Sequence, residues 1–351
     1  MSEERTEARV RRAVERATGR VAASLPVMRL AGHASLRSYW RVGEPPASQV
    51  VMVLPPDARS EEATKGAAPA ENAFVSVQRY LRSLGVRVPA ILAFHEDDPQ
   101  GGLMVLEDLG DEMLETQLAA GDPPGPHYER AIDALARLRA AAERSPDPSC
   151  VAFGRSFDRD LYRWELEHFV EWGLEAWKGR RLSAPEREEV SRHFEAIAGA
   201  LDAEPKGFTH RDYQSRNLMV LPGGEQAVID FQDALLGPRQ YDLVALLRDS
   251  YVELPPELVE RMLSRWLDRF AEAGGPRLDV GPFRAAFDLL TVQRKLKDAG
   301  RFVYIDRVKK NPGFLPSIPA SLRYVREAFA RRPDLAGLQE ILARHVPELA
   351  R

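Results

Sequence analysis

His210, Asp212 and Asn217 lie in one short polar loop between two apolar segments, and Asp230 ends the apolar run AVID soon afterwards. One carboxylate in such a loop can accept the proton of an attacking hydroxyl, while an amide oxygen and a second carboxylate hold Mg²⁺ against phosphate groups. The pattern therefore indicates phosphoryl transfer, with Asp212 as base and with Asn217 and Asp230 as metal ligands. We expect His210 to be a buried residue that shapes the loop by hydrogen bonding.

The spacing of these residues separates this chemistry from others. His210, Asp212 and Asn217 fit the H-x-D-x-x-x-x-N loop that protein kinases use, and Asp230-Phe231 follows in the right order at a strand end. The sequence has no GxSxG or GxxxxGK[ST] motif and no His/Cys cluster with zinc spacing. A chance match without chemistry is the alternative, and the Asp-Phe pair weighs against it.

Composition narrows the class of protein further. The 351 residues are 44% hydrophobic and 29% charged, and the net charge of −4 gives no general attraction to nucleic acid or to an anionic membrane. The single cysteine, Cys150, excludes an internal disulfide, and no apolar run reaches the length of a membrane span. Together with the charged N-terminus, these features predict a cytoplasmic protein, either a monomer or a weak dimer.

The elements that must position the loop follow from hydrophobic spacing and turn residues. An amphipathic helix is predicted over 5–20, strands over 38–42, 49–56, 90–96 and 102–110, and a helix over 71–85 that ends at a glycine. Helices are then predicted over 127–143, 160–179, 184–203, 242–252, 255–273, 282–300 and 320–345. The fold class is α+β, with a small lobe over 1–106 and a mostly helical lobe over 107–351.

The segment THRDYQSRNLMVL, followed by AVIDFQDALLGPRQYDLVALLRDSY, resembles the aminoglycoside-phosphotransferase-like kinases. Within that family the runs IDFQDA, YDLV, QRKLKDAGRF and SIPASLRYV look most like the bacterial anomeric N-acetylmuramate and N-acetylglucosamine kinases of cell-wall recycling. The resemblance implies a two-lobed protein-kinase-like fold, ATP and Mg²⁺ as cofactors, and an amino sugar as acceptor. An aminoglycoside, a choline-like compound or an amino alcohol is the alternative acceptor.

The same resemblance implies roles for further residues. The hairpin AGHASLRSYWRV would cover the phosphates, with contacts from Ser35, Arg37 and Ser38, although a solvated hairpin tip is the alternative. Backbone groups of Glu107, Asp108 and Leu109 would meet adenine. Asp242 would brace the catalytic loop or cap a helix, and Asp233 would bind sugar hydroxyls or cap the loop.

The sequence departs from the family pattern at one position. Kinases of this shape carry a lysine on the strand after the hairpin, paired with a helix glutamate such as Glu71, but VVMVLPP has no lysine. Arg37, Arg41 or Lys65 could supply the cation instead. The departure also allows a pseudokinase that binds nucleotide without catalysis, but retention of Asp212, Asn217 and Asp230 argues against it.

A basic stretch near the C-terminus bears on the acceptor. Arg294, Lys297 and Arg301 recur at helical spacing and so share one face. If that face borders the catalytic residues, Arg294 and Lys297 suit an acceptor that is neutral or carries a carboxylate, as N-acetylmuramate does. The alternative is a solvated basic face. The tryptophans at 164, 172 and 177 are interpreted as core or groove residues, with stacking on a sugar as the second possibility.

Overall fold

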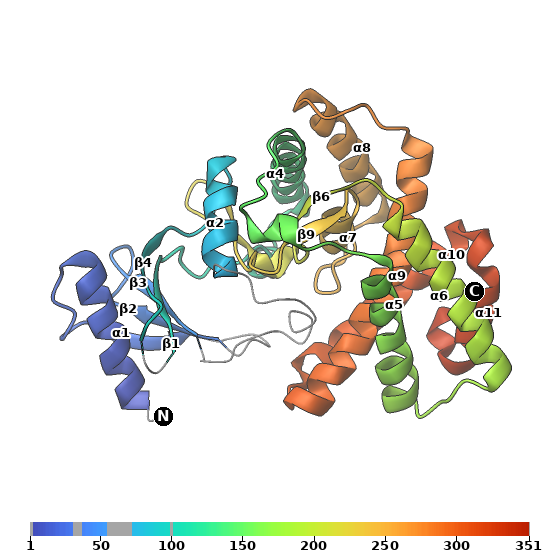
Figure 1. Cartoon of the computed structure of the whole chain (residues 1–351), viewed down its shortest axis with the longest axis horizontal. Coiled ribbons are helices and arrows are strands. Elements are labelled where there is room, and N and C mark those ends of the chain that lie inside the picture. The colour runs from blue at the N-terminus through green and yellow to red at the C-terminus, as the bar shows by residue number, and fades with distance from the viewer. Residues whose placement is uncertain (1–2, 31–36, 55–71, 99–100, 351) are drawn as a thin grey trace.

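The computed structural model describes residues 3–30, 37–54, 72–98 and 101–350, and within them the chain forms two parts (Figure 1). An antiparallel sheet with one helix on its outer side makes up the N-terminal part, and a larger assembly of helices makes up the rest. This arrangement is the two-lobed α+β fold that the element pattern predicts.

The N-terminal sheet has five strands in the order β1-β2-β3-β5-β4, and every neighbouring pair is antiparallel. Its strands are β1 (Val27–Leu30), β2 (Ser38–Val42), β3 (Gln49–Val53), β4 (Ile91–His95) and β5 (Leu103–Glu107). Because side chains alternate along a strand, the sheet has two distinct faces. Trp40, Val51 and Val105 pack under α1 (Glu3–Thr18), whereas Met52 and Met104 join the core shared with the rest of the molecule.

Helix α2 (Ala73–Ser83) connects this sheet to the helical part. The Asn72 side chain caps its first turn by accepting a hydrogen bond from the backbone N–H of Phe74. Phe74 then packs against Phe231 with the two rings tilted and their centroids 4.6 Å apart, and the Tyr80 ring lies 5.4 Å from that of Phe208. Helix α2 thus packs against β6, which leads into the polar loop, and against Phe231, which directly follows Asp230.

The helical part holds the polar loop between two small strand pairs. Strand β6 (Lys206–Thr209) pairs with β9 (Leu235–Pro238), and β7 (Leu218–Val220) pairs with β8 (Gln226–Val228). Residues 210–217 therefore leave one pair and enter the other, which fixes both ends of the loop. The surrounding α-helices are α3 (Leu114–Ala119), α4 (Pro124–Arg144), α5 (Arg159–His168), α6 (Ala184–Asp202), α7 (Tyr241–Leu247), α8 (Pro256–Glu272), α9 (Val280–Lys309), α10 (Ile318–Arg331) and α11 (Ala336–His345).

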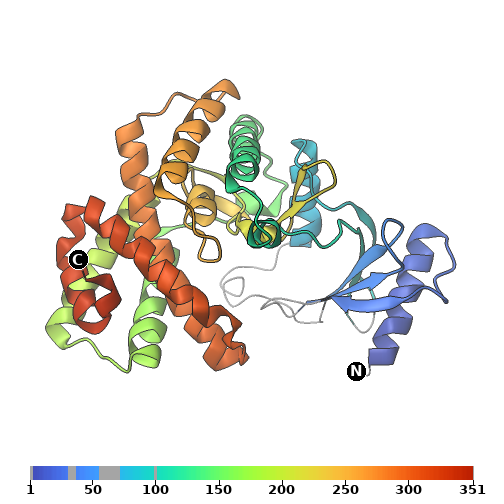
Figure 2. The same cartoon turned by 180° about the vertical axis from the view of Figure 1, so that it is seen from behind.

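Helix α9 is the central helix of this part, and α10 packs along it (Figure 2). It crosses η3, a π-helical segment (Phe169–Trp177) that continues α5. The crossing is close because residue 300 is a glycine: a Cβ there would lie 2.9 Å from the Phe169 Cα and 3.0 Å from the His168 carbonyl oxygen. Glycine at this position therefore lets the backbones of α9 and η3 approach each other closely.

Several predicted boundaries were wrong for identifiable physical reasons. The helix predicted over 242–252 ends at Leu247, because Asp249 turns away to bind the polar loop. The single helix predicted over 320–345 is two helices, separated at Pro333, which lacks a backbone N–H to continue the first. Strand β1 was not predicted, since its four residues, VMRL, are too few for a clear alternation.

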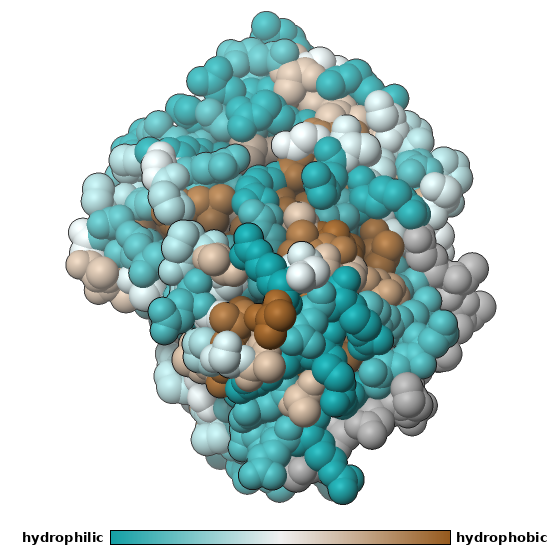
Figure 3. All heavy atoms as spheres, turned by 90° about the vertical axis from the view of Figure 1, so that its left-hand side faces the viewer, coloured by the Kyte–Doolittle hydropathy of each residue, from teal (hydrophilic) through white to brown (hydrophobic). Residues whose placement is uncertain are grey.

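The outer surface of the sheet end is shown in Figure 3. Hydrophilic side chains cover much of this face, and apolar side chains appear as patches among them. Within the described ranges, no helix combines the length and the apolar character needed to cross a lipid bilayer.

Candidate active site

The backbone of the polar loop is held by Asp242 at the start of α7. Its Oδ2 accepts the N–H of His210 at 2.8 Å, and its Oδ1 accepts the N–H of Arg211 at 2.9 Å. Arg211 has a φ of 81°, in the left-handed region that costs free energy for a side chain with a Cβ. The buried carboxylate therefore holds the loop in a conformation that the chain would not adopt by itself. These two hydrogen bonds are the contacts that the predicted bracing role of Asp242 requires.

His210 is fully buried and links the loop to the strand that precedes Asp230. Its Nε2 lies 3.0 Å from the Ile229 carbonyl oxygen, and its Nδ1 accepts the N–H of Asp212 at 3.2 Å. Burial lowers the pKa of the imidazole, so the ring is neutral with its proton on Nε2. These two bonds give His210 a position from which it shapes the loop, as its sequence context predicts.

Asp212 lies within reach of solvent and beside a cation from a distant helix. Its Oδ1 accepts a hydrogen bond from the Arg294 guanidinium at 3.2 Å. Surrounding protein raises the pKa of the carboxyl, but the positive charges of Arg294 and Lys297 outweigh that effect, so the pKa lies below its usual range. Asp212 is therefore a carboxylate at neutral pH, the form that can accept a proton.

Asn217 and Asp230 present oxygen atoms suited to a hard cation. The amide nitrogen of Asn217 donates to the Asp212 carbonyl at 2.8 Å, which leaves the amide oxygen as the atom for a metal. Asp230 is exposed and has a φ of 62°, and the protein around it and the charge of Asp212 raise its pKa. A bound Mg²⁺ would neutralise the negative charge that Asp230 and Asp212 place close together. The oxygen atoms of Asn217 and Asp230 therefore suit this metal ion. Within the described ranges there is no cluster of three or more His, Cys, Asp or Glu residues suited to a metal.

A second buried aspartate holds the loop, and the sequence analysis missed it. Asp249 is fully buried, and its Oδ2 accepts the N–H of Ser215 at 2.9 Å and the Ser215 hydroxyl at 2.5 Å. The Ile229 N–H also donates to the Asn217 carbonyl oxygen at 3.0 Å, which ties the loop to the strand of Asp230. The only signal in the sequence was the LLRD run, to which no role was assigned.

Comparison with known proteins agrees with this geometry. The sequence model described as "Phosphotransferase enzyme family" matches residues 26–279, more than half of the chain. The chain belongs to this family. The matched range includes both the N-terminal sheet and the complete loop with Asp212, Asn217 and Asp230.

Relatives within the phosphotransferase enzyme family extend over most of the chain. A Pseudomonas putida protein named N-acetylmuramate/N-acetylglucosamine kinase is 34% identical over 316 residues, covering 88% of this chain and 85% of that protein. A Caulobacter vibrioides protein of the same name is 30% identical over 345 residues, covering 91% of each chain.

Solved structures show the same fold at low sequence identity. The choline kinase LicA from Streptococcus pneumoniae superposes with a TM-score of 0.61 at 14% identity, over 93% of this chain and 99% of that chain. The ADP-bound aminoglycoside phosphotransferase APH(2'')-Ib gives a TM-score of 0.57 at 13% identity, over 92% and 99%. Identities this low show a shared fold and nothing more about the acceptor.

The structure narrows the choice of cation that could replace the missing family lysine. Arg41 is buried and its guanidinium is held by Asp108 at 2.6 Å and by Asp111 at 2.8 Å. Arg37 acts on Asp230, where its charge offsets part of the rise in pKa that the surrounding protein and Asp212 cause. Lys65, like Ser35 and Glu71, lies outside the described residues. Among the described residues, Arg37 is therefore the candidate replacement for the lysine whose charge acts on the predicted metal site.

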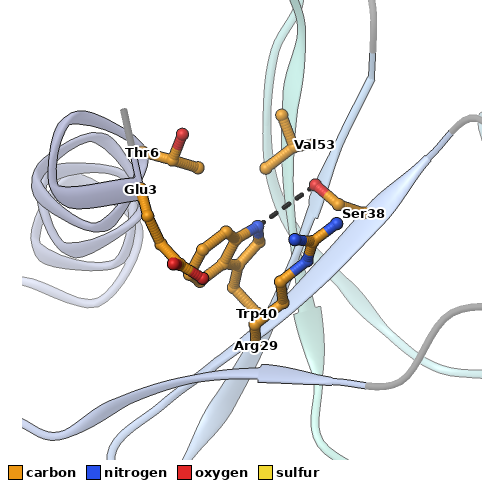
Figure 4. Close-up of a pocket in the computed structure, with 6 residues that line it drawn as sticks. All are labelled: Glu3, Thr6, Arg29, Ser38, Trp40 and Val53. Carbon is orange, nitrogen blue, oxygen red and sulfur yellow. Dashed lines mark hydrogen bonds between the residues drawn. The ribbon is translucent and has the colours of Figure 1, made fainter. Parts of the chain in front are cut away.

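Ser38 lies on the opposite side of strand β2 from this cation. Its hydroxyl accepts a hydrogen bond from the Trp40 indole at 3.1 Å, and both side chains line a cavity of about 460 Å³ between α1 and the sheet (Figure 4). The other lining residues are Glu3, Thr6, Arg29 and Val53. Tyr39, on the other face of the strand, has its pKa raised by burial and by the charge of Asp230. The Ser38 hydroxyl is thus directed away from the predicted metal site, and this placement does not favour a phosphate contact through its side chain.

The predicted adenine-contacting connector has well-defined partners. The Arg87 guanidinium binds Glu107 at 2.6 Å, and the Glu107 N–H donates to the Ala90 carbonyl oxygen at 2.9 Å. Asp108 accepts hydrogen bonds from Arg41 and, at 2.6 Å, from the Ser48 hydroxyl. Because the Glu107 N–H is already used, any adenine contact from this residue has to come from its carbonyl. The adenine role of residues 107–109 stays a prediction.

The residues predicted to meet the acceptor lie in two places. Asp233 accepts a hydrogen bond at 3.1 Å from Gln232, which also donates to Asp230 at 3.0 Å. Arg294, Lys297 and Arg301 follow one face of α9, starting at Asp212. Arg294 is only 1% exposed, so the alternative of a solvated basic face is wrong for this residue.

A group of aromatic side chains from α5, η3 and α9 lies beyond Arg294, toward the C-terminal end of α9. The Arg301 guanidinium stacks over Tyr304 at 4.7 Å, and Tyr304 meets Trp172 edge-on at 5.0 Å. Trp164 lies 5.4 Å from the His168 ring. Trp172 and Trp177 are partly buried against the hydrophobic core, which agrees with their interpretation as core or groove residues, whereas that interpretation stays a prediction for Trp164.

Proposed function

We propose that this protein transfers the γ-phosphoryl group of ATP to the anomeric hydroxyl of an amino sugar, N-acetylmuramate or N-acetylglucosamine. The observation that carries the proposal is the loop geometry: a carboxylate kept ionised at Asp212, with the Asn217 amide and the Asp230 carboxylate beside it. The amino-sugar part of the proposal is supported by the names of relatives that match along most of their length.

In this reaction the sugar hydroxyl oxygen attacks the γ-phosphorus, and the bond from that phosphorus to the bridging oxygen of ADP breaks. Asp212 accepts the hydroxyl proton as the new O–P bond forms. Bound Mg²⁺ would neutralise charge on the phosphate oxygens, and Asn217 and Asp230 are the residues that would hold it. Arg37, whose charge acts on Asp230, would add positive charge beside the phosphates.

The test is phosphoryl transfer from radiolabelled ATP by the full-length protein with Mg²⁺. The acceptors are N-acetylmuramate, N-acetylglucosamine, kanamycin and choline, each assayed separately. Methyl glycosides of the two sugars serve as matched controls, because a methyl group on the anomeric oxygen removes the proposed nucleophile and leaves the other hydroxyls intact. We expect label on the free sugars and none on the methyl glycosides.

Other outcomes would overturn the proposal at different levels. Label on a methyl glycoside would show that another hydroxyl is the acceptor. Label on kanamycin or choline, but on neither sugar, would replace the amino-sugar assignment with one of the alternative acceptors. A protein that binds Mg·ATP but phosphorylates nothing in the panel would support a pseudokinase.

A further inference from the structure

Arg294 is a buried cation that contacts the catalytic loop at two successive residues. Its Nη1 donates to the Arg211 carbonyl oxygen at 2.8 Å, and its Nη2 reaches the Asp212 Oδ1 at 3.2 Å. The side chain is 1% exposed and its guanidinium lies 4.7 Å from the Tyr241 ring centroid. One rigid, planar group thus joins the backbone of residue 211 to the carboxylate of residue 212.

We propose that Arg294 is a positioning residue for the phosphoryl-transfer reaction, which orients Asp212 toward the acceptor hydroxyl rather than binding the acceptor itself. The inference rests on the proposed function only in requiring that Asp212 act on a hydroxyl. It changes the role expected from the sequence, where Arg294 was assigned to a substrate carboxylate. The guanidinium is already committed to the loop, and its burial leaves little surface for a sugar.

The geometry explains how such orientation works. A carboxylate on a short side chain can rotate about two single bonds, and a base that is misplaced by about 1 Å can cost about 10²-fold in rate. With Oδ1 held by Arg294, Oδ2 is the oxygen that accepts the proton. The bond to the Arg211 carbonyl fixes the cation itself relative to the loop, so that the carboxylate cannot pull Arg294 out of place.

The placement of Arg294 depends on the packing of α9 around it. Glu165 on α5 is fully buried and accepts a hydrogen bond from the Gln293 amide at 2.7 Å. It also lies 3.6 Å from the Arg211 guanidinium, so the loop and α9 share one carboxylate. Lys295, the next residue on α9, donates to the Ser250 hydroxyl at 3.2 Å, and Asp298 of the same helix holds its ammonium at 2.8 Å. The residues on either side of Arg294 in the sequence thus bind groups outside α9, Gln293 to Glu165 and Lys295 to Ser250, which restrains rotation of the helix.

The test compares Arg294→Gln and Arg294→Lys with wild type, each alone and combined with Asp212→Asn. Arg284→Gln, on the same helix but paired with Glu260 away from the loop, is the matched control. The measurements are kcat, the acceptor KM, the Mg·ATP dissociation constant and the melting temperature. Slow hydrolysis of ATP, in which water replaces the sugar, is measured too, so that a wrong acceptor assignment does not prevent the comparison.

For a positioning residue, Arg294→Gln lowers kcat about 10- to 100-fold, while the acceptor KM and the Mg·ATP affinity stay within about 3-fold of wild type. Arg294→Lys recovers part of the loss. Its ammonium can hold the Asp212 Oδ1 but cannot bind the Arg211 carbonyl oxygen at the same time, as the guanidinium does. In the Asp212→Asn background the same substitution changes the rate by less than about 3-fold, since the group that it positions is gone.

Three results would overturn the inference. A raised acceptor KM with kcat intact would return Arg294 to the substrate. An equal loss in the Asp212→Asn background would show that the two residues act independently. A parallel fall in kcat, Mg·ATP affinity and melting temperature, with no recovery in Arg294→Lys, would reduce Arg294 to a structural role. Failure of the proposed function has a separate signature, which is hydrolysis of ATP without transfer to either sugar.

Discussion

The carboxylate of Asp242 accepts the backbone N–H groups of both His210 and Arg211, although 31 positions separate Arg211 from Asp242 in the chain. Arg211 is held at a φ of 81°, so this pair of bonds stabilises the conformation that places Asp212. Asp242→Asn keeps the size of the side chain but sets an amide N–H against one of the two donors.

We expect Asp242→Asn to lower kcat about 10- to 100-fold, because the loop relaxes and displaces Asp212. The variant is also expected to lose about 1–3 kcal/mol of unfolding free energy, since one buried N–H is left without an acceptor. Steady-state kinetics and urea unfolding measure the two effects. A variant with wild-type kcat would show that the loop holds its conformation without this brace.

Asp212 itself gives the sharpest test of the chemistry. Asp212→Asn removes the proton acceptor but keeps the hydrogen-bonding shape, so turnover is expected to fall about 10²- to 10⁴-fold. The affinity for Mg·ATP is expected to remain within about 3-fold, because the acceptor proton plays no part in nucleotide binding. Isothermal titration and initial rates separate the two. Wild-type turnover in this variant would remove Asp212 from the role of base.

Asp230 is expected to matter for the metal complex rather than for the nucleotide alone. Its pKa is raised by the surrounding protein and by the charge of Asp212, and a divalent cation relieves that crowding. Asp230→Ala should therefore weaken binding of Mg·ATP and abolish turnover, while the affinity for ATP in excess EDTA changes little. Titrations with and without Mg²⁺ make the comparison. Unchanged Mg·ATP affinity would argue against the metal assignment.

The sequence was sufficient to find the residues of the loop because they are close together in the chain. His210, Asp212 and Asn217 share eight residues, and Asp230 follows at the next strand end, so their spacing is a local pattern. Arg294 is 82 positions from Asp212, and no local pattern links two such residues. Helical spacing predicted the face that contains Arg294, but only packing shows that this face meets the loop. The same reason hid Asp249, which reaches back 34 positions to Ser215.

The ion pair between Arg41 and Asp108 predicts how stability depends on pH. Burial raises the pKa of Asp108, but hydrogen bonds from Arg41, Ser48 and the Gly110 N–H outweigh it, and the folded-state pKa lies below the usual value. A lowered folded pKa means that the carboxylate stabilises the fold above its unfolded pKa of about 3.9, and that this contribution is lost as pH falls through the folded value.

Asp108→Asn should therefore be less stable than wild type at pH 7, because Arg41 loses the charge of one of its two carboxylate partners. The loss should be limited to about 1–3 kcal/mol, since Asp111 still balances part of the Arg41 charge. The difference should begin to shrink below about pH 4, where Asp108 of the unfolded chain takes up its proton, and should be lost once the pH falls below the lowered folded-state pKa. Urea unfolding at a series of pH values measures both. A difference that stays constant down to pH 3 would mean that the charge of Asp108 does not contribute.

Gly300 offers a test of how α9 carries Arg294 to the loop. A Cβ at this position would lie 2.9 Å from the Phe169 Cα and 3.0 Å from the His168 carbonyl oxygen, and these backbone atoms cannot move aside as a flexible side chain could. Gly300→Ala must separate α9 from η3, and we expect a loss of about 1–3 kcal/mol of unfolding free energy, as for other overpacked sites. The kcat should fall as well, since Arg294 lies less than two helical turns away on the displaced helix. Gly199 on α6 is the matched control, because a Cβ there meets nothing within 4 Å. Alanine has the higher helix propensity, so Gly199→Ala should be stabilised by up to about 1 kcal/mol with its kcat unchanged. Equal stability and activity in the two alanine variants would show that the close crossing at Gly300 is not what sets the position of α9.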